Sequence, residues 1–347
     1  MNRRSVSDPA RSSALAKRLV ALPLLIVFLT ASSGNIRGST ENPSLSFRAA
    51  SAIQTARNLR SGAVVRVRGS DARGELYGTG FFVDPTGTIC TTADLVKGLE
   101  SIVIVKDGKE YPCHILALDE GCGVAFLKLT GEMPHAGENF LPPHATPTPL
   151  PFSPAVALGY SKEEEHSLSV GMIAGTRSHE GDSYFRIPQI IAKIPLAEGE
   201  AGAPVFDLDG HLLGMVLAGK TDSGDCRILL VGAIEKLHTD LLRFGQLNPG
   251  WVGAVVEEAA VPEGNSITRI ASVEHGSPAE SAGVRSGDMV LAFGNRQITQ
   301  PDQLLEASFY LTSGECVPMT ISRGGKIRHI EIHCIAPPVG NIHTSTP

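Results

Sequence analysis

The residues that could support covalent catalysis in this sequence fall into two small groups. One is Ser178-His179-Glu180 together with Ser183 in the segment RSHEGDSYF, and the other is Cys122 with His114 as a thiol and a base. Acyl transfer needs a nucleophile, a general base and a group that orients the base, and only a fold brings these together. We therefore interpret the first group as a solvated polar loop and the cysteine as a buried packing residue.

Two acidic residues, Asp94 and Glu200, are a further candidate for proton transfer or for a metal ion if the fold brings them together. We instead expect Asp94 to form a local hydrogen bond or a helix cap. The six cysteines show no C-x-x-C pair and no zinc-type spacing. The sequence therefore predicts neither a metal site nor a cofactor.

The elements that must position these side chains are short strands. From Ser61 onward, segments rich in Val and Ile alternate with turns of Gly, Asp or Pro, as in AVVRVRG, GTGFFVDPTGTICTT and VAFLKL. A Pro-rich connection over 134–154 precedes a second set of strands, from AVALGY to RILLVGAI. This pattern favours a mainly β fold with two barrels over βαβ units. A helix is then expected in GAIEKLHTDLLRFG, with an apolar face of Ile234, Leu237, Leu241 and Leu242.

Residues 248–336 predict a compact α+β domain of their own, which begins at Asn248-Pro249-Gly250. Strands are expected near 253–257, 266–274, 288–293, 315–322 and 327–334, and helices near 277–283 and 301–311.

Three motifs in the first unit follow the order found in exported serine proteases. They are GTGFFVD followed by TTADLV, then DEGCGVAFLK, then GEAGAPV followed by DGHLLG. With them, the chain resembles the HtrA/Deg family over residues 58–335. The resemblance implies a trypsin-like double β-barrel over 58–247. It also implies that Asp94 stands at the position of the catalytic histidine, Gly123 at that of the aspartate and Ala201 at that of the serine.

Each of these three substitutions removes part of the chemistry. The methyl group of Ala201 has no atom that can attack a carbonyl, and Gly123 has no side chain to orient a base. Asp94, with an ordinary pKa of ~3.9, is a poor base near neutral pH. The backbone N–H groups of Gly199 and Ala201 would remain as a remnant oxyanion hole, opposed by the charge of Glu200.

The second unit resembles the PDZ domain of the same family through VEHGSPAESAGV followed by GDMVL. Trp251-Val252-Gly253-Ala254 matches the loop that captures a peptide carboxylate with backbone N–H groups. Packing is the alternative role for Trp251. The resemblance implies a peptide site between the next strand and the helix near 301–311, formed by Trp251, Val252, Gly253, Ala254, Val255, Val256, Leu304, Ala307, Ser308 and Leu311.

The N-terminal residues 1–33 predict a secretory signal peptide. Basic residues precede an apolar run of about 13 residues from Leu19, short of the ~20 that span a bilayer. An uncleaved anchor is the alternative, so membrane association is expected only there. Residues 34–57 predict a linker with weak helical character, and 337–347 a frayed tail. We expect an exported protein of the periplasm, the cell envelope or the extracellular space.

The composition limits the classes of partner. The chain has 347 residues, a net charge of −6 and only 5% aromatic residues, without a long basic run. These values disfavour nucleic acid as a partner. The expected partners are peptide C-termini or unfolded proteins. The resemblance further implies a homotrimer or a mixed oligomer with an active paralogue.

Export would permit disulfides among the six cysteines. Cys316 and Cys334 flank the hairpin VPMTISRGGKIRHIEIH. A two-residue turn at Gly324-Gly325 would place Cys316 opposite His333, whereas a bulged turn would bring it to Cys334.

The expected function is that of a pseudoprotease. It would bind peptides or unfolded chains through its PDZ domain, as a scaffold, a chaperone-like holder or a regulator of an envelope protease in protein quality control. The alternative is an active serine-type endopeptidase with a relocated or non-standard catalytic site.

Overall fold

The computed structural model describes residues 61–71, 74–162, 166–178, 187–217, 225–260 and 266–338. The predicted signal peptide or anchor (1–33) and linker (34–57) lie outside the described residues. So do residues 179–186 of the polar loop and residues 339–347 of the predicted tail.

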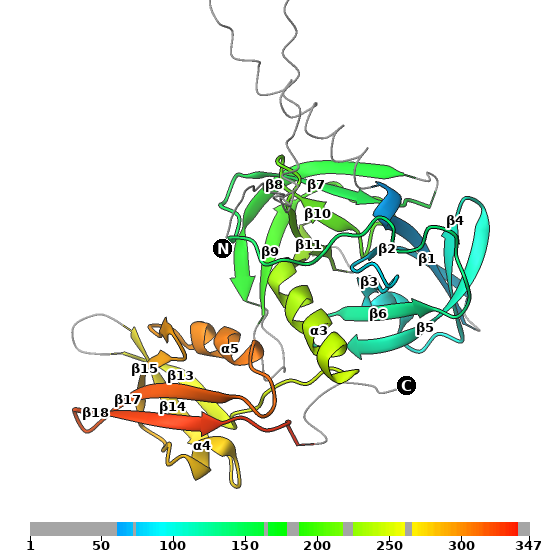
Figure 1. Ribbon diagram of the computed structural model, residues 1–347. Coiled ribbons are helices and arrows are strands. Elements are labelled where there is room, and N and C mark those ends of the chain that lie inside the picture. Colours follow the sequence, from blue (N-terminus) through cyan, green and yellow to red (C-terminus); the bar gives the residue numbers. More distant parts are fainter. Residues whose placement is uncertain are drawn as a thin grey trace, which may run out of the picture. The chain divides into compact units, whose positions relative to one another are not determined.

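The first part of the chain forms two closed antiparallel barrels, which confirms the predicted mainly β fold (Figure 1). The strands of the first barrel follow the order β1-β2-β3-β6-β5-β4. Its elements are η1 (Ser61–Ala63), β1 (Val64–Asp71), β2 (Gly74–Phe82), β3 (Ile89–Thr92), α2 (Ala93–Val96), β4 (Ser101–Lys106), β5 (Lys109–Asp119) and β6 (Val124–Leu129).

The second barrel follows the order β10-β11-β12-β9-β8-β7. The Pro-rich connection joins it to the first barrel, as expected. Its elements are β7 (Pro154–Gly159), β8 (Ser167–Ser178), β9 (Pro188–Lys193), β10 (Pro204–Phe206), β11 (Leu212–Val216) and β12 (Cys226–Leu230).

Each barrel is filled by inward-facing aliphatic side chains, and a further core cluster joins the two barrels. Burying one such side chain contributes about 1.5–3 kcal/mol to folding. The joining cluster includes Phe81, Phe126, Phe206, Met215 and Leu229, all less than 2% exposed. The region where the barrels meet is therefore rigidly packed.

Helix α3 (Val231–Phe244) packs on this joining cluster through Ile234, Leu237 and Leu241, as predicted. It ends at Gly245, whose φ of 69° suits a left-handed C-cap. The prediction for Leu242 was wrong, because this side chain is 63% exposed. It follows Leu241 by one residue and therefore lies about 100° further around the helix.

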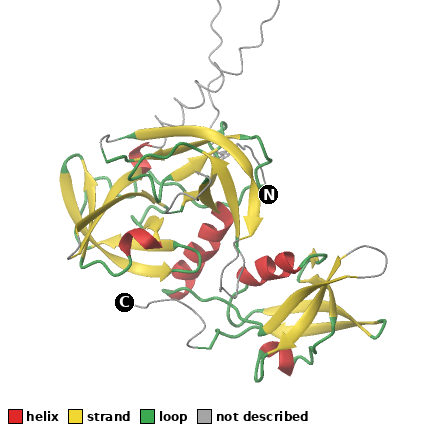
Figure 2. Cartoon of the chain, turned by 180° about the vertical axis from the view of Figure 1, so that it is seen from behind, coloured by secondary structure: helices red, strands yellow, loops and turns green. Residues whose placement is uncertain are grey.

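The C-terminal part forms a sheet of its own, accompanied by helices (Figure 2). The strand order of this sheet is β13-β14-β15-β17-β18, and β16 pairs with β15. The strands lie close to the predicted ranges, and the two helices are shorter than expected. The elements are β13 (Ala254–Ala260), β14 (Ser266–Val273), α4 (Pro278–Ser281), β15 (Met289–Phe293), β16 (Arg296–Gln297), α5 (Pro301–Phe309), β17 (Cys316–Arg323) and β18 (Lys326–His333).

The β17–β18 hairpin closes through Gly324 and Gly325, with φ values of 56° and 75°. This two-residue turn places Cys316 opposite His333. Cys334 lies on the opposite, buried face, and both cysteines are free. The suggested Cys316–Cys334 disulfide is therefore absent, because the turn lacks the extra residue of a bulge.

None of the helices in the described part of the chain combines the length and the apolar character that a membrane crossing requires.

Candidate active-site region and peptide-binding edge

The structure brings the segments that carry Asp94, Gly123 and Ala201 next to one another. The N–H of Ala93 donates to the carbonyl oxygen of Gly123 at 2.9 Å. On β2, a Cβ added at Gly78 would lie 2.2 Å from Leu95 Cδ2 and 3.1 Å from the carbonyl oxygen of Ala201. Strand β2 therefore passes closely between the helix that carries Asp94 and the turn that carries Ala201.

Asp94 is the second residue of the short helix α2, and its side chain is exposed. Thr92 occupies the N-cap position, so Asp94 does not cap the helix. Within the described residues, the Asp94 carboxylate makes no hydrogen bond or ion pair. The expected local bond is therefore not formed. The carboxylate stays in water, where the N-terminus of a helix favours negative charge.

Gly123 lies in the turn between β5 and β6 with a φ of 75°, the left-handed region that glycine adopts without strain. A Cβ at this position would lie 3.2 Å from Leu217 Cδ2. Both the backbone angle and the close neighbour oppose a larger residue there. A side chain at this position would therefore be strained.

Thr79 holds the loop that carries Ala201, a role that sequence reasoning missed. Its backbone N–H donates to the Ala201 carbonyl at 2.8 Å, and its hydroxyl donates to the Gly199 carbonyl at 2.9 Å. The same hydroxyl accepts the N–H of Tyr160 at 2.9 Å, and Thr79 is fully buried. In the sequence, only the position of Thr79 within the GTGFF motif could have indicated this role.

The loop opens on a cavity of about 300 Å³ that Gly199, Ala201 and Leu217 help to line. In the described part of the chain, the N–H groups of Gly199 and Ala201 make no hydrogen bond. They are therefore available to an acceptor. Another wall residue, Asp225, forms an ion pair with Lys193. Gly199 and Ala201, whose backbone N–H groups are unpaired among the described residues, thus both lie on the wall of this cavity.

Glu200 does not oppose an anion in the way that we expected from the sequence. Its carboxylate is buried and accepts the Ser169 hydroxyl at 2.9 Å and the N–H of Ala197 at 2.7 Å. Glu200 is also absent from the lining of the cavity. The Glu200 carboxylate therefore forms its hydrogen bonds within the second barrel. It neither pairs with the exposed Asp94 nor lines the cavity.

The suggested thiol–imidazole pair is not assembled. Cys122 is 4% exposed, and burial together with the nearby Asp119 carboxylate raises the pKa of its thiol well above the ordinary value. A thiol of raised pKa is a weak nucleophile near neutral pH. His114 lies within β5 opposite Lys128, whereas Cys122 lies in the turn beyond the end of that strand.

Strand β13 lies at one edge of the C-terminal sheet, next to helix α5. Of the side chains predicted to bind a peptide, Val255 is 47% exposed. Four others are less than 10% exposed, namely Trp251, Val252, Leu304 and Leu311. Ala254, Val256, Ala307 and Ser308 are partly buried.

Trp251 packs inside this domain and does not form an exposed lip. Its side chain is 6% exposed, and its backbone N–H donates to the Ile335 carbonyl at 2.7 Å. The ring lies close to Gly253, whose φ of 76° favours glycine. A Cβ there would lie 2.3 Å from Ser277 Cβ, so the loop before β13 is tightly constrained.

Comparisons with known proteins agree with this architecture. A family model described as "Trypsin-like peptidase domain" matches residues 78–215, and one described as "PDZ domain" matches residues 269–323. A solved structure described as "HtrA-type protease AlgW with tripeptide" has a TM-score of 0.69 and 18% identity, and covers 83% of this chain and 99% of that chain. The serine endoprotease from Yersinia pestis has a TM-score of 0.61 and 20% identity, and covers 82% and 98% respectively.

The curated relatives carry the name "Probable periplasmic serine endoprotease DegP-like". The relative from Marinomonas sp. (strain MWYL1) is 24% identical over 282 residues, which is 75% of this chain and 57% of the relative. The relative from Rhizobium meliloti (strain 1021) is 24% identical over 286 residues, which is 76% of this chain and 55% of the relative. The chain therefore spans about half the length of the curated relatives that it matches. It consists of a trypsin-like peptidase domain followed by a PDZ domain, and its relatives are DegP-like serine endoproteases.

Proposed function

We propose that this chain is a non-catalytic member of the DegP-like group that binds peptides or unfolded proteins through its PDZ domain. The observation that carries the proposal is that Ala201, a residue with only a methyl side chain, helps to line this cavity. A carbon side chain cannot form an acyl-enzyme, and losing the nucleophile removes most of the catalytic advantage of a triad.

The other two positions support the same proposal. Asp94 carries an exposed carboxylate on α2 in place of the imidazole that serves as the general base of a Ser-His-Asp triad. Gly123 cannot orient a base, and its left-handed backbone disfavours the side chain that would do so. A single substitution would therefore not rebuild the reaction centre.

Binding is proposed to occur by addition of a peptide strand to β13. An edge strand offers backbone groups for main-chain hydrogen bonds, and a carboxylate can be held by backbone N–H groups of the preceding loop. Val252 and Gly253 lie in the loop that precedes β13, and α5 supplies the opposite wall with Ala307 and Ser308. Two solved HtrA-type neighbours carry a decapeptide and a tripeptide, as their descriptions state.

The absence of catalysis is tested on unfolded casein with the purified full chain and a fluorophosphonate probe. We expect no cleavage above buffer and no labelled serine. Robust cleavage that persists in Asp94→Asn would contradict the proposal. A single labelled serine, lost on denaturation, would instead establish the relocated active site.

Peptide binding is tested by fluorescence anisotropy with a library of peptides that have free C-termini. The matched control is each peptide with its C-terminus amidated, which removes the carboxylate and leaves the protein unchanged. We expect binding of the free form to weaken at least about tenfold on amidation, because charge-assisted hydrogen bonds of roughly 1.5–3 kcal/mol are lost. Equal binding of both forms, or of neither, would contradict the proposed carboxylate loop.

A protein variant locates the site. Ala307→Arg places a long side chain on α5 beside β13, whereas the control Glu258→Gln changes an exposed residue of β13 conservatively. Binding should fall only in Ala307→Arg, provided that both variants keep the unfolding midpoint of the parent.

We further propose that the protein acts in the periplasm or elsewhere in the cell envelope, as a scaffold, a holder of unfolded chains or a regulator of an active paralogue. The periplasmic naming of its relatives supports this location. Native mass measurement, alone and with an active paralogue, distinguishes a monomer, a homotrimer and a mixed oligomer. Fractionation that leaves the protein in the cytosol would contradict the proposed location.

A further inference from the structure

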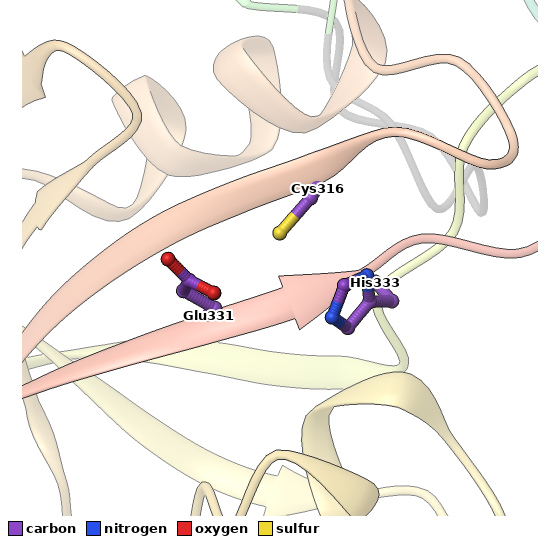
Figure 3. Close-up of side chains that lie close together, drawn as sticks. All are labelled: Cys316, Glu331 and His333. Atoms are coloured by element: carbon purple, nitrogen blue, oxygen red, sulfur yellow. The ribbon is translucent and has the colours of Figure 1, made fainter.

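Three side chains of different metal-binding chemistry converge on the β17–β18 hairpin of the PDZ domain. Cys316 lies on β17, and Glu331 and His333 lie on β18 (Figure 3). One thiol sulfur, one carboxylate oxygen and one imidazole nitrogen all lie within 4.8 Å of one another. This cluster is remote in sequence from every motif of the protease-like domain.

The register of the hairpin produces the convergence. Cys316 is the direct cross-strand partner of His333, and Glu331 precedes His333 by two residues, so all three share one face. The intervening residue Ile332 is fully buried on the other face. A shift of register by one residue would separate the ligands, and the two-residue Gly-Gly turn sets the observed register.

All three side chains are exposed and unengaged. Within the described part of the chain, none of them makes a hydrogen bond or an ion pair. The second cluster of this kind, Asp207 with Asp209 and His211, differs in this respect. There the Asp207 carboxylate already accepts two backbone N–H groups and contacts the His211 ring at 3.0 Å, so it is a turn cap.

The chemistry of the ligand set favours Zn²⁺. Thiolate, imidazole and carboxylate are the three ligand types that Zn²⁺ takes in proteins, with bond lengths of about 2.0–2.3 Å. A tetrahedral site with such bonds separates its ligand atoms by roughly 3.5 Å. Rotation about the side-chain torsions of these exposed residues can close the remaining distance.

A fourth coordination position on the Zn²⁺ ion would remain open. Glu331 and His333 also line a cavity of about 400 Å³, together with Gly276, Pro278 and Ser281 from the α4 region. Three protein ligands with a fourth position left to water or an exogenous ligand is the arrangement of an open zinc site. We propose that Cys316, Glu331 and His333 form a Zn²⁺-binding site with one exchangeable position on the PDZ domain.

The test uses the reduced full chain after chelator treatment, titrated with Co²⁺ and then with Zn²⁺. We expect one equivalent of Co²⁺ with a thiolate-to-cobalt charge-transfer band, displaced stoichiometrically by Zn²⁺. Cys316→Ser should abolish the band, and Glu331→Gln and His333→Gln should each weaken binding at least about tenfold. The matched control is His329→Gln, an exposed histidine of the same strand that bonds to Thr320, and it should change nothing.

Alkylation of Cys316 gives a second readout that does not depend on the cobalt spectrum. Bound Zn²⁺ should slow the reaction of this thiol with iodoacetamide at least about tenfold in the parent and in His329→Gln, but not in His333→Gln. Binding without a thiolate band, or unchanged affinity in both Glu331→Gln and His333→Gln, would overturn the proposal. An alkylation rate that is insensitive to Zn²⁺ would overturn it as well.

Discussion

His238 Nε2 lies 2.9 Å from Asp84 Oδ2, and both side chains are 8% exposed. The two residues stand 154 positions apart and connect helix α3 to the turn between β2 and β3 of the first barrel. Asp84 Oδ1 also accepts the Thr86 hydroxyl at 2.7 Å and the Thr88 N–H at 3.1 Å. This buried pair therefore joins the C-terminal helix of the trypsin-like domain to its first barrel.

Removing one partner of this pair should destabilise the trypsin-like domain strongly. We expect His238→Ala to lower the free energy of unfolding by about 3–5 kcal/mol, because the Asp84 charge stays buried without its partner. The exposed pair His211–Asp207 is the matched control, and His211→Ala should cost less than about 1 kcal/mol. Urea unfolding measures both variants, and equal losses would contradict the role of burial.

The pair should also make stability depend on pH in the acid range. Burial raises the pKa of Asp84, but hydrogen bonds from His238, Thr88 and Thr86 outweigh it and hold that pKa below its ordinary value. The carboxylate then contributes its full stability above its unfolded pKa of about 3.9, and the contribution falls as the pH drops toward the lower folded pKa. The difference in unfolding free energy between the parent and Asp84→Asn should therefore shrink below pH ~4. A difference that is constant from neutral pH into the acid range would contradict this assignment.

Two buried threonines should respond differently to the same substitution. Thr79→Val leaves the Gly199 carbonyl and the Tyr160 N–H without their partner, so we expect a loss of about 2–4 kcal/mol. Thr92 is 1% exposed and its hydroxyl has no partner among the described residues, so Thr92→Val should be neutral or stabilising by up to about 1 kcal/mol. Thermal unfolding of both variants gives the comparison, and a large loss in Thr92→Val would mean that its hydroxyl is engaged.

Restoring the nucleophile alone should not restore proteolysis. Ala201→Ser should show no casein cleavage, because neither a base nor an orienting group accompanies it. Adding Asp94→His and Gly123→Asp to this variant supplies the base and the orienting group. Gly123→Asp should lower the free energy of unfolding by about 1–2 kcal/mol, because the aspartate would have to adopt the left-handed φ of 75°. Casein cleavage by Ala201→Ser alone would show that another base reaches the new hydroxyl group.

One cysteine should react far faster than the others in the native, chelator-treated chain. Cys316 is exposed, whereas burial raises the pKa of the Cys113 and Cys226 thiols to about 12 and protects Cys90, Cys122 and Cys334. Iodoacetamide followed by peptide mapping should therefore label Cys316 first. Fast labelling of Cys122 would instead support a catalytic thiol there.

Local patterns predicted the architecture closely. Alternation of apolar and polar residues indicated the strands of both barrels, and the Pro-Ala start and the glycine turns of the C-terminal domain indicated its helices and hairpin. These features depend on neighbours a few residues apart, so the sequence displays them directly. Leu242 was misjudged because one residue separates the buried face of α3 from the exposed face, and only packing shows where that boundary lies.

The sequence by itself determined that position 201 carries no nucleophile and that position 123 carries no side chain, because these are matters of residue identity. The tertiary structure decided everything that depends on contacts between distant segments. It placed Thr79 under the Ala201 loop, turned the Glu200 carboxylate into the second barrel and joined Asp84 to His238. It also set the register that brings Cys316 to His333, since a turn of two residues and a turn with a bulge are equally compatible with Gly324-Gly325 until the strands are paired.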